Sequence, residues 1–115
     1  MAFYRALRSA VRRDYLITFK VRAADLLSCG EESWKEGFGY MVARHHLDFV
    51  LCDRQTTEIC AAIELDDCSH ELATRKRRDV FLNEAFAAAK IPLIRFCARS
   101  RYDCRVISET IDQFI

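Results

Sequence analysis

Carboxylates at two places in the chain lie within apolar segments, where a charge is out of place. Asp48 interrupts the run from Leu47 to Cys52, and Glu64 and Asp66 lie at the end of the run from Ile59 to Asp66. Burying a carboxylate without a partner costs several kcal/mol, so each of these acids needs a cation or a hydrogen-bond donor. Their types and positions therefore favour a chemical role over a packing role.

A short connection is expected to bring these carboxylates together. About five residues, Asp53 to Thr57, join the two apolar runs, which is the length of a hairpin and predicts antiparallel neighbours. Asp48 and Glu64 then lie at similar distances from the turn and converge on one face. With the backbone carbonyl of Leu65 they would form an oxygen-lined site for Mg²⁺ or Mn²⁺. Such an ion activates a bound water and stabilises charge on a phosphate oxygen.

The alternative to a metal site is pairing of the acids with arginines. The candidates are Arg95, in the expected strand 91–97, and Arg75 and Arg78, in the expected helix 70–90. Arg75 and Asp79 share one helical stripe with the apolar residues of that helix, so an Arg75–Asp79 pair would face inward. Such a pair would orient the carboxylates or present a cation to a phosphate.

His70 is the histidine nearest to the acids at the end of the third expected strand. Beside Glu64 and Asp66, it is a candidate site residue. The alternative is a surface or helix-capping residue. His45 and His46 are interpreted as residues that enter a strand.

The pattern of apolar residues predicts an α/β domain. The expected elements, in chain order, are a helix at 3–11, strands at 15–21, 47–52 and 58–66, a helix at 70–90, a strand at 91–97 and a helix at 106–114. The first helix begins without a cap residue, which suggests that the chain was cut from a longer protein. The 115 residues are expected to form a single domain.

Composition excludes several classes. The chain is 51% hydrophobic and 30% charged with a net charge of +1, so it is not a disordered protein and shows no overall basic character. No apolar stretch is long enough for a membrane helix, and no signal peptide is visible. The six cysteines include no Cys-x-x-Cys pair, and those in apolar runs, Cys52 and Cys60, are expected to be free thiols of a cytoplasmic protein.

Clusters of basic residues and of aromatic residues give weaker indications that the protein binds nucleic acid. Arg75 to Arg78 form a basic run, and the arginines Arg12, Arg13, Arg99, Arg101 and Arg105 could add a rim that follows phosphates. Most such runs are solvated helix faces. Trp34, Phe38 and Tyr40 could stack on unpaired bases, or pack their loop onto the core.

Several of these segments, read in order, resemble one known family. Asp48-Phe49-Val50-Leu51, then Ala62-Ile63-Glu64-Leu65-Asp66-Asp67-x-Ser69-His70, then Arg78-Asp79, then Ile91-Pro92-Leu93-Ile94-Arg95-Phe96 are similar to domain-of-unknown-function family 2726. That family is placed in the PD-(D/E)XK, or restriction-endonuclease-like, nuclease superfamily, near the very short patch repair endonucleases. The resemblance covers the chain from about Val21 to the C-terminus. It implies a mixed sheet of about four strands between helices.

The resemblance also implies site residues. Asp48 takes the place of the first metal-binding acid and Glu64 that of the second, with Mg²⁺ or Mn²⁺ as the ion. Asp66 stands where the superfamily usually has lysine, so it is either a third metal ligand or the mark of a lost enzyme. In the repair-endonuclease branch a histidine just downstream assists the chemistry, a place that His70 fits. The acid of the first helix is missing from the chain.

Two functions are therefore expected from the sequence. The first is a metal-dependent nuclease in which Asp48, Glu64, Asp66 and His70 cleave a phosphodiester of nucleic acid, with DNA as the expected substrate and Arg75, Arg78, Asp79 and Arg95 in support. The second is a module that kept the fold without catalysis and binds nucleic acid or a protein partner.

Overall fold

A computed structural model of the chain describes residues 2–11, 14–27, 44–66 and 73–115, and the side chains of 73–78 lie outside this description. The described elements are, in order, α1 (Ala2–Val11), β1 (Tyr15–Arg22), α2 (Ala23–Leu26), β2 (His46–Asp53), β3 (Ile59–Asp66), α5 (Ala73–Ala88), β4 (Leu93–Cys97) and α6 (Cys104–Asp112). The predicted α/β order is confirmed, apart from the four-residue helix α2, which sequence periodicity cannot reveal at that length.

The four strands form one mixed sheet in the order β1-β2-β3-β4. β1 pairs antiparallel with β2, β2 pairs antiparallel with β3, and β3 pairs parallel with β4. The predicted hairpin between β2 and β3 is confirmed. In its turn, a carboxylate oxygen of Asp53 accepts hydrogen bonds from the N–H groups of Gln55 at 2.8 Å and Thr56 at 2.9 Å. These bonds, the Thr56 bond foremost, lower the pKa of Asp53.

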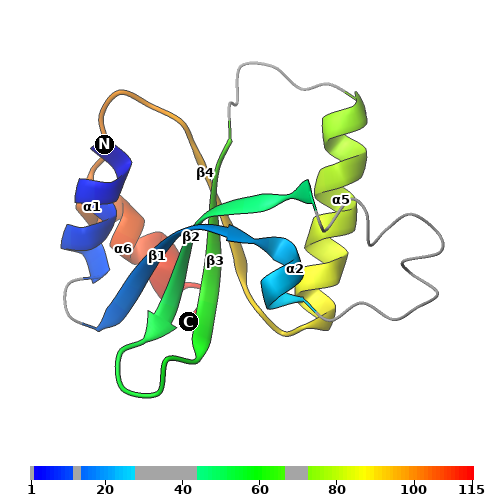
Figure 1. The fold of residues 1–115 in the computed structure, drawn as a ribbon. Helices are drawn as coiled ribbons and strands as arrows, with labels where there is room; N and C mark the ends of the chain where they lie inside the picture. The colour runs from blue at the N-terminus through cyan, green and yellow to red at the C-terminus, as the bar shows by residue number, and fades with distance from the viewer. Residues whose placement is uncertain (1, 12–13, 28–43, 67–72) are drawn as a thin grey trace.

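Helices cover both faces of the sheet (Figure 1). α1 and α6 lie on one face, where Phe3, Leu7 and Val11 repeat every four residues and are all buried. They share a core with the inward residues Phe49 and Ile63 of the sheet. α2 and α5 lie on the other face, where the core contains buried residues from both the helices and the strands, namely Ala23, Leu47, Val50, Ala62, Leu82 and Phe86.

Alternation along β3 decides which helices the acids face. Ala61 and Ile63 belong to the core under α1 and α6, whereas Ala62 belongs to the core under α5. Glu64 follows Ala62 by two residues and so points toward the α5 side. Along β2, strict alternation would place Leu47 on the face of Phe49, but Leu47 packs in the α5 core.

The cysteine prediction is only partly right. Cys52 and Cys60 are free thiols, and burial raises the pKa of each. Cys97, at the end of β4, is disulfide-bonded, a bond that the sequence did not predict. Within the described ranges, no helix has the length and apolar character needed to cross a membrane.

Candidate functional site

Asp48 and Glu64 lie opposite each other on neighbouring strands. The β2–β3 register pairs Val50 with Ala62 and Phe49 with Ile63, so the next pair toward this end of the sheet is Asp48 with Glu64. A carboxylate oxygen of Asp48 accepts a hydrogen bond from the backbone N–H of Leu65 at 2.8 Å. The side chain of Asp48 therefore continues the pairing of the two strands beyond their last backbone partners. The structure brings together the two acids that the hairpin argument selected.

The hydrogen bond from the Leu65 N–H to Asp48 also indicates where the Leu65 carbonyl points, and this carbonyl is the backbone oxygen expected among the metal ligands. In a strand, the N–H and C=O groups of one residue face the same neighbouring strand. Because the Leu65 N–H meets Asp48 of β2, its carbonyl is directed to the β2 side, whereas the Asp66 carbonyl on the other side accepts from Ala98 at 2.8 Å. The Leu65 carbonyl therefore points toward the strand of Asp48, as it must in order to bind a metal ion together with Asp48 and Glu64.

Glu64 is the buried acid of the described residues, with a side chain only 5% exposed. One of its carboxylate oxygens accepts a hydrogen bond from His45 Nε2, and the other accepts from Arg95 Nη1 at 2.6 Å. A buried carboxylate requires such partners, since without them its desolvation is uncompensated. The predicted alternative of pairing with Arg95 is therefore present in the structure, and it coexists with the arrangement of Asp48 beside Glu64.

Arg95 is the centre of the charged cluster. It stands beside Glu64 in the parallel β3–β4 register, and the same Nη1 lies 3.3 Å from a carboxylate oxygen of Asp66 and 3.5 Å from one of Asp79. Its Nη2 donates to the side-chain oxygen of Asn83 at 3.2 Å. A planar guanidinium can serve several acceptors at once, so Arg95 fixes the positions of three carboxylates, two from β3 and one from α5.

Lys20 supplies the second permanent cation. The β1–β2 register places it opposite Asp48, and its Nζ lies 3.5 Å from the Asp48 carboxylate. The Lys20 side chain is 73% exposed, so the pair itself adds little stability. Its backbone has φ 48°, the left-handed region that disfavours residues with a Cβ. Costly backbone conformations cluster at functional sites, which supports Lys20 as a member of the candidate site.

The described residues of the cluster carry charges of both signs. Its four carboxylates, Asp48, Glu64, Asp66 and Asp79, meet two permanent cations, Arg95 and Lys20, with His45 as a hydrogen-bond donor. Among the residues described, no three His, Cys, Asp or Glu side chains are placed to hold a metal ion together. A site here would have to combine carboxylate oxygens with backbone oxygen or water, as Mg²⁺ sites commonly do.

Some predicted residues cannot be placed. His70 lies outside the described residues, as do the side chains of Arg75 and Arg78, the arginines Arg12 and Arg13, and the aromatic residues Trp34, Phe38 and Tyr40. The expected Arg75–Asp79 pair therefore stays a prediction, while Asp79 is seen near Arg95.

Three members of the cluster were not expected from the sequence. His45 was interpreted only as a strand-entry residue, and Lys20 and Asn83 were not singled out. Lys20 could have been found by extending the β1–β2 hydrogen-bond register to Asp48. Asn83 lies four residues after Asp79, on the same helix face. No sequence signal links His45 to Glu64, because that contact depends on how the chain enters β2.

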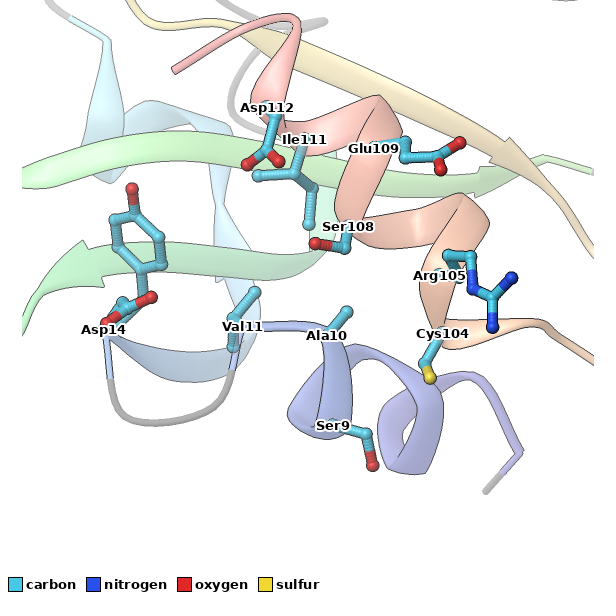
Figure 2. A pocket seen from close by; sticks show the side chains of 11 residues that line it. Ser9, Ala10, Val11, Asp14, Cys104, Arg105, Ser108, Glu109, Ile111 and Asp112 are labelled. Carbon is cyan, nitrogen blue, oxygen red and sulfur yellow. The ribbon is translucent and has the colours of Figure 1, made fainter.

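One cavity lies away from Asp48 and Glu64, and a second lies next to the charged cluster. The first, about 560 Å³, opens between α1 and α6 on the far side of the sheet, and three acids, Asp14, Glu109 and Asp112, line it together with Arg105 (Figure 2). There, burial raises the pKa of Tyr15, with Cys60 and Asp14 adding to the effect. The second, about 530 Å³, is lined by Asn83, Arg95 and apolar residues of α5 and β4. Of these two cavities, the second borders the charged cluster, through Arg95.

Comparison with known proteins identifies a family but no characterised relative. No curated protein and no solved structure matches the chain. One family model does, and it covers residues 1–114. Since this is nearly the whole chain, the protein belongs to the family described as protein of unknown function, DUF2726.

Proposed function

We propose that this protein is a metal-dependent nuclease of the PD-(D/E)XK type, which hydrolyses phosphodiester bonds of nucleic acid. The observation that carries the proposal is the placement of Asp48 and Glu64 at opposed positions of two antiparallel strands, on one face, with the Leu65 backbone between them. Placement of the family in this superfamily, a cytoplasmic location and DNA as the preferred substrate are part of the same proposal.

The donor chemistry of the site suits Mg²⁺ or Mn²⁺. Asp48, Glu64 and the Leu65 carbonyl offer hard oxygen ligands, with Asp66 nearby as a further one. The described donors to Asp48, Leu65 N–H and Lys20 Nζ, use two of the roughly four lone-pair positions of a carboxylate. A bound ion would supply the activation of water and the neutralisation of phosphate charge.

The protein side chains have positioning roles in this proposal. Arg95 and His45 hold the Glu64 carboxylate from both oxygens, so its direction is fixed before any ligand arrives. Lys20, exposed beside Asp48, is available to contact a phosphate oxygen of the substrate. The role of His70 in protonating the leaving group stays part of the proposal without a described position.

One observation favours a second candidate, a nuclease-fold module that binds without catalysis. Both oxygens of Glu64 already accept hydrogen bonds from the protein. An acid held in this way can be a purely structural residue of the fold. This alternative predicts that divalent ions bind no more tightly to the wild type than to a variant that lacks Asp48.

The test compares two carboxylate-to-amide changes. Asp48→Asn keeps the size of the side chain and an oxygen that can accept from Leu65, and Asp25→Asn makes the same change at an exposed residue paired with Arg22. Labelled single-stranded DNA, duplex DNA and RNA are incubated with each protein in Mg²⁺, Mn²⁺ or EDTA, and Mn²⁺ binding is measured by calorimetry.

The proposal predicts cleavage that EDTA stops, that Asp48→Asn reduces at least a hundredfold, and that Asp25→Asn leaves unchanged, with on the order of 10² being typical for loss of one catalytic group. A wild type that binds Mn²⁺ no better than Asp48→Asn and cleaves no substrate would refute the nuclease and favour the binding module.

A further inference from the structure

A smaller cavity of about 240 Å³ lies where β4 leads into α6. It is lined by three arginines, Arg95, Arg99 and Arg101, together with Tyr102 and apolar residues. Pockets for drug-sized ligands usually start at about 300 Å³. The cavity is thus suited to a small group, and the arginines suggest that the group is an anion.

Two of the charged residues that line this cavity, Arg99 and Arg101, are available to bind a ligand. Arg99 and Arg101 are exposed, and across the described ranges neither of them takes part in an ion pair. The acid in the lining, Asp103, is engaged as the cap of α6, where its carboxylate accepts from the Arg105 N–H at 2.9 Å. Guanidinium groups bind phosphate oxygens in a bidentate fashion, which makes phosphate the best match.

The segment that carries the arginines is held in place. The Arg99 N–H donates a hydrogen bond to the Tyr102 hydroxyl at 2.6 Å. The Tyr102 ring packs edge-on against the buried ring of Phe3, with centroids 5.0 Å apart. Because these contacts fix the backbone, less conformational entropy is lost when a ligand binds.

The same segment starts at the acidic cluster. The Ala98 N–H donates to the carbonyl of Asp66 at 2.8 Å, so the chain leaves the end of β4 directly beside that acid. Arg95 belongs to both places, because it lines the cavity and pairs with Glu64. The cavity is lined by α6 residues and so lies toward the opposite face of the sheet from the acids, and Arg95, on the edge strand β4, is common to both places.

We infer that this cavity binds a phosphate of the polynucleotide adjacent to the phosphate that is cleaved, through Arg99 and Arg101. The inference rests on the proposed function, because it assigns the substrate path of that same site. It places the bound strand across the end of β4, from the acids toward α6. Phosphate also occurs in free nucleotides, so the experiment must separate the two sources.

The test measures binding of labelled oligonucleotides in Ca²⁺ or EDTA as a function of salt concentration. The double variant Arg99→Gln/Arg101→Gln is compared with Arg5→Gln/Arg8→Gln, which removes the same charge from exposed positions of α1 outside the cavity. A third variant, Arg99→Lys/Arg101→Lys, keeps the charge. Circular dichroism and thermal unfolding establish that all three are folded.

Loss of two phosphate contacts is expected to reduce the steepness of the slope of log K against log salt by about 1.4. Between 1 M and 0.1 M salt, the affinity of the double variant should therefore rise about 25-fold less than that of the wild type. The α1 control keeps the wild-type slope, and the lysine variant keeps most of it. Thymidine monophosphate and inorganic phosphate at millimolar concentration displace the oligonucleotide only weakly.

The unfavourable outcomes separate the two proposals. Oligonucleotide binding with equal slopes for the cavity variant and the wild type, or an equal loss in the α1 control, would overturn this inference and leave the nuclease standing. Complete displacement by inorganic phosphate would assign the cavity to a free phosphate and also overturn it. A slope that depends on Arg99 and Arg101, without any cleavage in Mg²⁺ or Mn²⁺, would support this inference and count against catalysis.

Discussion

Replacing Arg95 by methionine is the most informative perturbation of the charged cluster. The Glu64 side chain is 5% exposed and loses its 2.6 Å partner, so a buried carboxylate is left with His45 alone among its described donors. Breaking a buried pair from one side typically costs 3–5 kcal/mol, and because Arg95 is itself 22% exposed we expect about 3 kcal/mol. For a chain of 115 residues this corresponds to a fall of roughly 12 °C in Tm.

A second change tests whether the loss of stability comes from the charge of Glu64, which has lost its arginine partner. In the Arg95→Met background, Glu64→Gln removes that charge and should recover part of the stability. We expect the two changes together to cost about 2 kcal/mol less than the sum of each alone. Urea unfolding followed by circular dichroism gives all four free energies, and equal m values show that the unfolded states are comparable.

Divalent ions add a readout that connects the cluster to the proposed chemistry. If Glu64 is a metal ligand, Mg²⁺ can take over part of the role of the arginine, so 10 mM Mg²⁺ should raise the Tm of Arg95→Met more than that of the wild type. A loss below about 1 kcal/mol, or additive costs of the two changes, would refute the reasoning that Arg95 compensates Glu64. An equal effect of Mg²⁺ on both proteins would argue against a metal at Glu64.

Three further predictions concern other features. Asp53→Ala should weaken the β2–β3 turn, and because the pKa of Asp53 is lowered in the fold, its stabilisation is present above the ordinary value of 3.8 and is lost as the pH falls through the lowered one. Urea midpoints from pH 7 to pH 2 should therefore converge for the two proteins, and a constant gap would contradict this. Alkylation by iodoacetamide at pH 8, followed by mass spectrometry, should modify exposed Cys104 well before Cys52 and Cys60, whose pKa values are raised by burial, and equal rates would contradict it. Lys20→Gly relieves a positive φ and should leave thermal stability unchanged or raise it by up to about 1 kcal/mol, whereas a loss would show that the Lys20 side chain is structurally needed.

The sequence predicted most of the sheet because its signals are local. The connection from Asp53 to Thr57 is short enough to determine the direction of β3, and the register then follows from which residues face the core. The same logic brought Asp48 and Glu64 together. Leu47 departs from the alternation of side chains because alternation assumes a regular strand, and Leu47 lies near the start of β2.

The rest of the cluster depends on contacts that are distant in sequence. His45 reaches Glu64 across 19 residues and Arg95 reaches Glu64 across 31. Both donors were visible as residues, but their geometry depends on how three strands and a helix meet. For Arg95 the chemical need of a buried acid for a cation narrowed the choice to a few arginines, whereas nothing in the sequence favoured His45 over His46.

The packing of α1 against α6 has a consequence for the order of folding. The sheet is made of sequential neighbours, so β1, β2 and β3 can pair as soon as each has been synthesised. The core between the sheet and the helices α1 and α6 contains Phe3 and Val11 from α1 and Ile107 and Ile111 from α6. These contacts span sequence separations of around one hundred residues. We expect a nascent chain to hold a paired sheet whose α1 face is only partly covered until α6 emerges from the ribosome. A chaperone that protects apolar surface would be needed during that interval more than at any other.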